Sequence, residues 1–172
     1  MKLAKEFFNR DCLTVARELV GKILVHNING VEYKLKITET EAYIGETDSA
    51  CHAYKGRTPR TETMYKKGGT VYIYLCYGMH HLLNIVTGKE NEAEAVLIRA
   101  CEKPYDGPGK LTKALKITKE LNNTDVISEI SEIYFESDEE DFEVITGKRI
   151  GIDYAKEEDR EKQWRFILQK RN

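Results

Sequence analysis

The chain has 172 residues, a formal net charge of −2, 41% hydrophobic and 33% charged residues. A chain of this length can bury a core without covalent staples, and we expect one domain over residues 1–172. The four cysteines are scattered without a CxxC pair, which favours reduced thiols in the cytoplasm over a disulfide scaffold. The sequence predicts neither a secretory leader nor a membrane span.

The charges are distributed unevenly along the chain. Residues 120–147 contain ten acidic residues and no Lys or Arg, so the rest of the chain carries a net charge of +8. This asymmetry is compatible with a surface that faces phosphates and an acidic face turned away from them. On charge alone, an ordinary solvated surface is the simpler explanation.

Helix signals occur at two places in the sequence. Residues 12–20 are predicted to form a helix with Asp11 as its N-cap and Gly21 as its stop. Its apolar stripe is formed by Leu13, Ala16, Leu19 and Val20. A short helix is also predicted near residues 110–116.

Strand patterns dominate the remainder, and Asn29-Gly30 and Gly78 predict hairpin turns. A polar loop is predicted over residues 44–69 and a surface loop over 138–141. The predicted strands span residues 22–28, 31–43, 70–77, 80–87 and 94–101, with two closing strands near 143–145 and 164–168. We therefore predict a mixed α+β fold, a single domain with a curved, mostly antiparallel sheet, a protruding β-hairpin and surrounding helices.

The strand 31–43 carries the first candidate for chemistry. Alternation predicts that Glu39 and Glu41 share a face with Leu35 and Ile37, which marks that face as inward. A carboxylate that loses water there is suited to act as a general base near neutral pH. Glu41 lies nearer the polar loop and is the stronger candidate. The periodicity alone also fits two structural alternatives: a Glu that pairs with a buried Arg, or a Glu at a frayed strand end that reaches solvent.

The second predicted hairpin is rich in aromatic residues. Tyr72, Tyr74 and Cys76 share one face, and the aliphatic side chains of Val71, Ile73 and Leu75 occupy the other. The tyrosine face could stack a flat ligand, since stacking contributes roughly 1–3 kcal/mol per base. Tyrosine also simply favours strands.

The tip of this hairpin carries Tyr77 and Met79 on either side of Gly78. Bulky side chains at an exposed tip are costly for solubility. Apolar wedges between DNA bases are a known use for such residues.

The loop between the hairpins is basic, with Glu62 as its single acid among residues 55–67, and nearby glycines would let the backbone approach a phosphate chain. His52 lies at its start. A plain solvated loop is the alternative. The basic residues are Lys55, Arg57, Arg60, Lys66 and Lys67.

Two further polar side chains, those of Arg99 and Asn84, are predicted to lie on the inward face of their strands. Arg99 shares parity with Ala95, Leu97 and Cys101, and a buried Arg needs an acid or an anionic site, so Glu41 is a candidate partner. Asn84, in line with Leu82 and Val86, could bond a base edge or cap a backbone group. The Cys and His residues lack zinc-ligand spacing or a triad signature, and we expect no metal and no cofactor.

These motifs, in this order and spacing, resemble the alkyladenine (3-methyladenine) DNA glycosylase family. The resemblance runs from the helix before Gly21 to Trp164-Arg165-Phe166, but the acidic stretch 129–143 matches no family motif. The matching segments are Glu39–Gly45, Asp48–His52, Thr58–Arg60, Tyr72–Met79, Asn84-Ile85, Val96–Ala100, Gly107–Leu111 and Arg149–Ile152.

The resemblance implies a base-excision repair enzyme, one DNA glycosylase domain, that flips damaged purines out of DNA and hydrolyses their N-glycosidic bond with water. It implies that Glu41 is the general base and that Arg99 and the backbone around Ile150 help to hold the water. The other implied residues are Tyr43, His52 and Tyr74 in the pocket walls, Asn84 in excluding guanine, and Tyr77 in the gap left by the flipped nucleotide.

We therefore expect a monofunctional DNA-3-methyladenine glycosylase, acting on alkylated or deaminated purines. Its expected partner is double-stranded DNA containing damaged purines, without a membrane, and the protein is expected to be a cytoplasmic monomer, nucleoid-associated if bacterial. Two alternatives remain: a non-catalytic nucleic-acid-binding module, and a hydrolase of free nucleosides. The residues expected to contact DNA are Tyr77, Met79, Arg57, Arg60, Lys66, Lys67 and Lys110.

Overall fold

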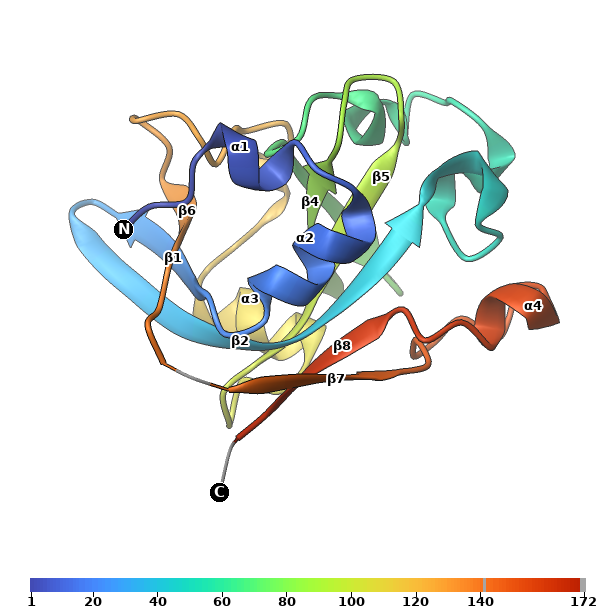
Figure 1. Ribbon diagram of the computed structural model, residues 1–172. Coiled ribbons are helices and arrows are strands. Elements are labelled where there is room, and N and C mark those ends of the chain that lie inside the picture. Colours follow the sequence, from blue (N-terminus) through green and yellow to red (C-terminus); the bar gives the residue numbers. More distant parts are fainter. Residues whose placement is uncertain (141, 171–172) are drawn as a thin grey trace.

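The computed structural model describes residues 1–140 and 142–170. Eight strands form one curled, antiparallel half-barrel sheet in the order β3-β4-β5-β2-β1-β6, with β8 paired to β2 and β7 paired to β8 (Figure 1). The protein is a mixed α+β single domain, which confirms the predicted fold class. Within these residues no helix has the length and apolar character that crossing a bilayer requires.

The predicted strands and helices form close to their predicted bounds. The strand β6 and the short helices α1 and α4 were not predicted, because four-residue elements carry little periodicity. The strands are β1 (Ile23–Ile28), β2 (Val31–Ile44), β3 (Val71–Cys76), β4 (His80–Thr87), β5 (Glu94–Cys101), β6 (Ile133–Glu136), β7 (Glu143–Gly147) and β8 (Arg165–Gln169). The helices are α1 (Lys5–Phe8), α2 (Cys12–Leu19), α3 (Pro108–Ala114) and α4 (Glu157–Arg160).

Helix α2 covers the core side of the sheet (Figure 1). Its N-terminus is capped as predicted, because the Asp11 carboxylate accepts a hydrogen bond from the Thr14 amide at 2.9 Å. Ala16, Leu19 and Val20 of the predicted stripe lie in the core, whereas Leu13 is only partly buried. The residues buried along α2 are Cys12, Val15, Ala16 and Leu19.

The long strand β2 changes face halfway along its length. Its register with β5 shifts between Ile37 and Glu39 and again between Glu39 and Thr40. Ile37, before the shift, and Ala42, after it, both lie in the main core. The Thr40 hydroxyl also points to the core side, where it donates to the Ala16 carbonyl at 2.6 Å.

This irregularity overturns the predicted alternation of β2. Glu41 does not share a face with Leu35 and Ile37, because simple period-two alternation fails across the shift. Glu41 and Tyr43 instead line a cavity on the opposite face of the sheet. Glu39 is likewise outside the core and lies 3.3 Å from Arg165.

Both predicted hairpin turns are present. The two central residues have positive φ in each turn, 52° and 86° at Asn29-Gly30 and 51° and 65° at Tyr77-Gly78. Such turns match the twist of the flanking strands. For Tyr77 this backbone conformation is strained, and it holds the tyrosine at the hairpin tip.

The segment 44–69 is a long connection between β2 and β3, as predicted, but it is partly ordered and partly buried. It contains the 3-10 helices η1 (Gly45–Thr47), η2 (His52–Lys55) and η3 (Glu62–Tyr65); a fourth, η4 (Lys119–Leu121), follows α3. Cys51, Ala53, Met64 and Tyr65 form a second buried cluster against β3 and β4. The segment therefore makes a packed wall above the sheet.

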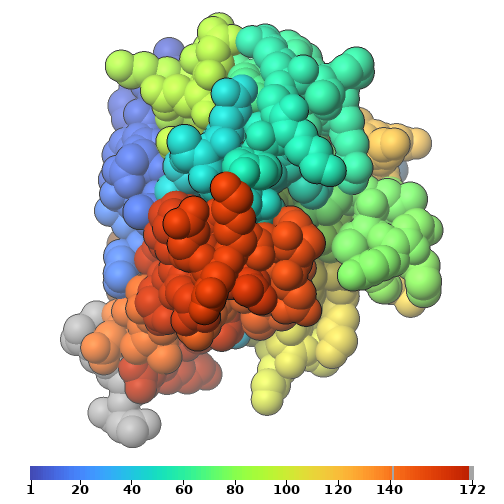
Figure 2. Space-filling view, turned by 90° about the vertical axis from the view of Figure 1, so that its right-hand side faces the viewer, coloured from blue at the N-terminus to red at the C-terminus, as the bar shows by residue number. Residues whose placement is uncertain are grey.

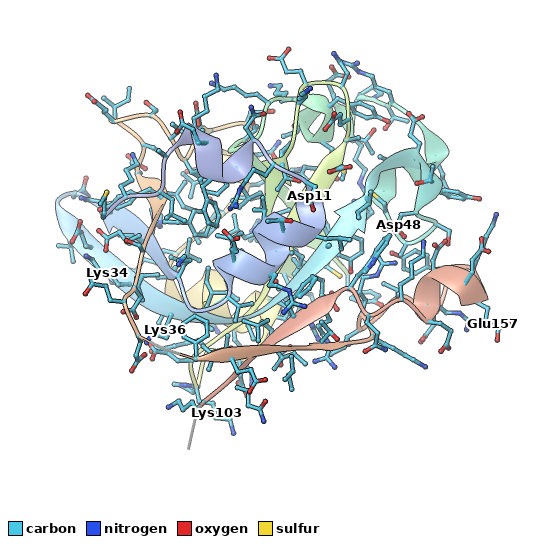
Figure 3. All side chains as sticks on the ribbon, in the orientation of Figure 1. Asp11, Lys34, Lys36, Asp48, Lys103 and Glu157 are labelled. Atoms are coloured by element: carbon cyan, nitrogen blue, oxygen red, sulfur yellow. The ribbon has the colours of Figure 1, made fainter. Side chains whose placement is uncertain are left out.

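Much of the acidic segment, residues 120–147, packs at the edge of the sheet that β6 forms. The opposite edge of the sheet is formed by β3. Lys34 lies 3.0 Å from Glu136, and Lys36 pairs with Asp138 at 2.9 Å and with Glu140. Both lysines lie together on β2 in Figure 3. Residues 138–140 have no regular structure, as predicted, and Asp141 lies outside the described residues.

A fully buried ion pair fastens the segment before α4 to the end of β2. Arg149 contacts the Asp48 carboxylate through both terminal nitrogens, at 2.6 and 2.9 Å. Arg149 also donates to the Ala42 carbonyl at 2.9 Å. Asp48 accepts from the Ile44 and Ala50 amides at 3.0 and 3.1 Å, so its charge is well satisfied, whereas Arg149 Nε is buried without a partner among the described residues (Figure 3 labels Asp48).

Asp48→Asn should lower stability by about 3 kcal/mol or more, because it leaves the Arg149 charge buried without a counter-ion. Urea unfolding followed by circular dichroism measures this change. Lys34→Met is the matched control, since its ion pairs with Glu32 and Glu136 are largely exposed and their loss should leave the free energy of unfolding nearly unchanged. Equal stability of the two variants would contradict the role given to the buried pair.

Candidate active site

A cavity of about 570 Å³ opens on the face of the sheet opposite α2. Strands β2, β3, β4 and β5 contribute its walls, and the N-terminal end of α3 and the segment before α4 close its rim. In Figure 2 the red segment near α4, the protruding green hairpin and the yellow segment near α3 surround one recessed part of the surface. Among the described residues, no group of three or more His, Cys, Asp or Glu side chains is gathered as metal ligands would be.

Glu41 is the fully buried acid of this cavity. Its Oε2 accepts a hydrogen bond from the Ile150 amide at 2.6 Å, and its Oε1 accepts one from the Tyr43 hydroxyl at 3.0 Å. Burial raises the pKa of Glu41 above its usual value, although the Ile150 amide and the Arg99 charge oppose this shift. The structure therefore presents a desolvated carboxylate with a basicity greater than that of a surface Glu.

Arg99 extends from β5 into the same cavity. Ala95 and Leu97 share its face, as predicted, but Cys101 lies in the main core because the β2–β5 irregularity changes the alternation. Arg99 forms no ion pair within 4 Å with Glu41, although its charge lowers the pKa of that group. Its Nε is buried without a hydrogen-bond partner in the described structure, so it can still serve a ligand or water.

Aromatic rings line one wall of the cavity. The His52 and Tyr74 ring centroids are 4.4 Å apart, and those of Tyr72 and Tyr74 are 5.6 Å apart. The Tyr72 hydroxyl lies 2.9 Å from His52 Nδ1. Burial lowers the pKa of His52 to about 4, so its ring is neutral at pH 7. The wall is therefore aromatic, rich in π-electrons and uncharged, with its rings inclined to one another by 42° to 89°.

The predicted orientation of side chains on β3 and β4 is confirmed except at Leu75, which is 40% exposed and lies outside the core. Tyr72 and Tyr74 face the cavity, whereas Val71 and Ile73 lie in the main core. Asn84 is buried on the cavity face, where its Nδ2 donates to the carbonyls of Tyr72 at 3.3 Å and Leu82 at 3.4 Å. With its amide hydrogens used by the backbone, Asn84 can present its carbonyl oxygen to an occupant.

The hairpin tip stands beside the mouth of the cavity. Tyr77 is 92% exposed and Met79 is 74% exposed, which is unusual for large apolar side chains. Tyr77 also contributes to the cavity lining. The structure therefore brings the predicted wedge next to the predicted pocket.

The predicted basic residues are not gathered into one free surface. Arg57 is paired with Glu62 at 2.7 Å, Lys67 with Asp125 at 2.9 Å and Lys110 with Asp106 at 3.2 Å. Lys110 nevertheless lies at the cavity rim. Arg60 and Lys66 line a separate hollow beside the tyrosine wall, together with Lys119, which was not predicted.

The sequence pattern did not predict which residues hold the cavity together. Asp48 and Arg149 were noted only as parts of motifs, and the isolated Arg before Ile150 gave no sign of its burial. Arg149 also stacks over the Tyr43 ring, with 4.9 Å between the guanidinium carbon and the ring centroid. Tyr154, another missed cavity residue, donates its hydroxyl to the Ala50 carbonyl at 2.6 Å.

Known proteins match this chain over nearly its full length. A model of the methylpurine-DNA glycosylase family matches residues 6–104 and 103–172. A protein from Clostridium perfringens is 48% identical over 98% of this chain and 96% of its own length. A protein from Natranaerobius thermophilus is 44% identical over 98% of this chain and 96% of its own length. A protein from Borreliella afzelii is 46% identical over 95% of this chain and 94% of its own length.

All three relatives are provisionally named 3-methyladenine DNA glycosylases. The family model reaches from α1 to the C-terminal end of the chain, so it includes every strand and the whole of the cavity described above. On this match and on these identities, the chain belongs to the methylpurine-DNA glycosylase family.

Proposed function

We propose that this protein is a monofunctional DNA glycosylase of base-excision repair that releases alkylated purines, such as 3-methyladenine, from double-stranded DNA. The observation that carries the proposal is the fully buried Glu41 carboxylate in a cavity with aromatic walls, beside an exposed tyrosine hairpin. The family of the chain and the names of its relatives support the same activity.

Access to the bond requires the damaged nucleotide to leave the base stack. Extrusion costs a few kcal/mol and costs least for a poorly paired base, which favours lesions. The exposed Tyr77 ring at the hairpin tip is placed to fill the vacancy, with Met79 beside it. The everted base then enters a cavity of about 570 Å³, which has room for a purine.

Recognition relies on the electronic character of the wall. Alkylation at a ring nitrogen makes the purine cationic, and the faces of Tyr43 and Tyr74 attract such a base by roughly 0.5–2 kcal/mol each. His52 supports this preference because burial lowers its pKa to about 4, so the imidazole adds no opposing charge at neutral pH.

Hydrolysis adds one water across the glycosidic bond. Glu41 accepts a proton from water as the water oxygen bonds to C1′, and the C1′–N bond breaks with its electron pair going to the purine. A cationic 3-methyladenine leaves as a neutral base and needs no acid, so one carboxylate is sufficient. Arg99, whose Nε lacks a partner, helps to hold the water. The products are a free base and an abasic deoxyribose.

We extend the proposal to deaminated purines, which have the same ring shape and fit the same walls. These bases are neutral, so the leaving nitrogen must take a proton from solvent. Their release is therefore expected to be slower than that of 3-methyladenine from otherwise identical duplexes.

Glu41→Gln should abolish release of purines from methylated duplex DNA, because an amide cannot accept the proton of water. Chromatography of released bases measures this, and binding to a lesion-bearing duplex should persist. Glu39→Gln is the matched control, since Glu39 lies on the same strand but pairs with Arg165. Near-normal turnover by Glu41→Gln would remove the assigned base. Failure of the wild type to release purines from duplex DNA would overturn the proposed function itself.

Tyr77→Ala should weaken binding to a lesion-bearing duplex by about tenfold, because the loss of one stacking side chain costs roughly 1–3 kcal/mol. Fluorescence anisotropy at fixed salt measures the affinity. Ile130→Ala is the control, since Ile130 is also 92% exposed but lies far along the chain from the hairpin. Unchanged affinity of the Tyr77 variant would exclude the wedge role.

Arg60→Ala combined with Lys66→Ala should reduce the salt dependence of DNA binding by about two phosphate contacts. These residues form no ion pair with an acid among the described residues. Arg57→Ala with Lys67→Ala is the comparison, because both side chains already pair with Glu62 and Asp125. A larger loss of salt slope in the comparison variant would reverse this assignment.

A further inference from the structure

The Glu41 carboxylate is held by donors from two separate parts of the chain. The Ile150 amide donates to Oε2 at 2.6 Å, and the Tyr43 hydroxyl, from the same strand as Glu41, donates to Oε1 at 3.0 Å. Each oxygen therefore has one fixed hydrogen bond. The backbone donor cannot rotate away, so the hydroxyl decides how the second oxygen is oriented.

Tyr43 is itself firmly placed. The Arg149 guanidinium lies 4.9 Å from its ring centroid, and Arg149 is anchored by the buried Asp48. Burial, together with the neighbouring Glu41 charge, raises the pKa of the Tyr43 hydroxyl well above its usual value. The hydroxyl therefore remains protonated, and it can act as a donor throughout the working range of pH.

We propose that the Tyr43 hydroxyl is a positioning group that orients the Glu41 carboxylate, a role separate from that of its ring in the cavity wall. This inference rests on the proposed function, in which Glu41 accepts a proton from water. With one lone pair of Oε1 bound to Tyr43 and one of Oε2 bound to Ile150, the remaining lone pairs have defined directions.

The two hydrogen bonds to the Glu41 carboxylate counteract an effect of its burial. A Glu deprived of water favours its neutral form, which cannot act as a base. Hydrogen bonds to the carboxylate favour the charged form and partly offset this cost, and Tyr43 is among the groups that lower the pKa of Glu41. The hydroxyl thus supports both the orientation and the ionisation of the base.

The chain contains a second tyrosine with the same two kinds of contact outside the cavity, although its carboxylate partner is exposed. The Tyr65 hydroxyl donates to Glu46 at 2.8 Å, and the Arg57 guanidinium lies 4.8 Å from its ring centroid. Tyr65 belongs to the second buried cluster and does not line the cavity. Tyr65→Phe is therefore a matched control for Tyr43→Phe, because each variant removes one hydroxyl bonded to a carboxylate.

The direct test is a titration of Glu41 by NMR of the ¹³C-labelled carboxyl carbon, with its signal assigned by its loss in Glu41→Gln. Tyr43→Phe should move this titration to higher pH, and Tyr65→Phe should leave it at the wild-type position. Other charged or titrating groups around Glu41 are retained in both variants. They are Arg99 on β5, Tyr74 on β3, His52 on η2, and Arg149 and Tyr154 before α4.

The second readout is the pH dependence of purine release in single turnovers. Because the pKa of Glu41 is raised, the base form is lost as pH falls, and Tyr43→Phe should shift this acid limb to higher pH. The rate on its acid side should fall by about tenfold, the effect of one hydrogen bond to a charged group. Lesion binding should be kept, since the phenyl ring still stacks.

Either of two results would overturn the positioning role: an unmoved Glu41 titration in Tyr43→Phe, or faster release by that variant, which would mark the contact as inhibitory. An equal shift in Tyr65→Phe would also overturn it, by making the effect non-local. A wild type that releases no purine would instead overturn the proposed function, and the NMR titration would still decide whether the hydroxyl orients Glu41.

Discussion

The buried contact between Asp48 and Arg149 is the interaction on which the site depends. Burying two charges is costly, and the cost is offset here by further hydrogen bonds between both side chains and the backbone. The consequence of this buried pair is geometric. The pair ties the segment before α4 to the end of β2, and it brings the Ile150 amide to within 2.6 Å of Glu41. That amide is the one backbone donor that the structure shows for the Glu41 carboxylate among the described residues.

Similar carboxylates acquire different properties from their surroundings. Burial raises the pKa of Glu41, whereas Glu39, two residues earlier, is partly exposed and pairs with Arg165. For Asp159 burial acts in the same direction, but hydrogen bonds from Ser49 and Lys162 prevail and hold its pKa at about 2. Asp159 is thus a permanent anion that anchors Ser49, and Glu41 alone among these three combines burial with raised basicity.

The sheet separates the charges that the sequence distributes unevenly. Lys34 and Lys36 on β2 neutralise acids at and after β6, at one edge of the sheet. The tyrosine hairpin forms the other edge. A DNA duplex that approached the hairpin would therefore lie away from the acids of residues 132–140, whereas Asp125 lies beside β3, where it is paired with Lys67. This arrangement explains how a chain with a net charge of −2 can carry a phosphate-compatible face.

The fold class, most strands, the Asp11 cap and both hairpin turns could be predicted from the amino-acid sequence, because these follow from local periodicity and turn chemistry. The sequence also marked Glu41 and the tyrosine face of β3. Tertiary structure alone decided which face Glu41 occupies, because the β2–β5 irregularity reverses the alternation, and local patterns do not encode a register shift. Likewise only the folded chain joins Asp48 to Arg149 across about a hundred residues, since the partner of a buried charge is chosen by packing.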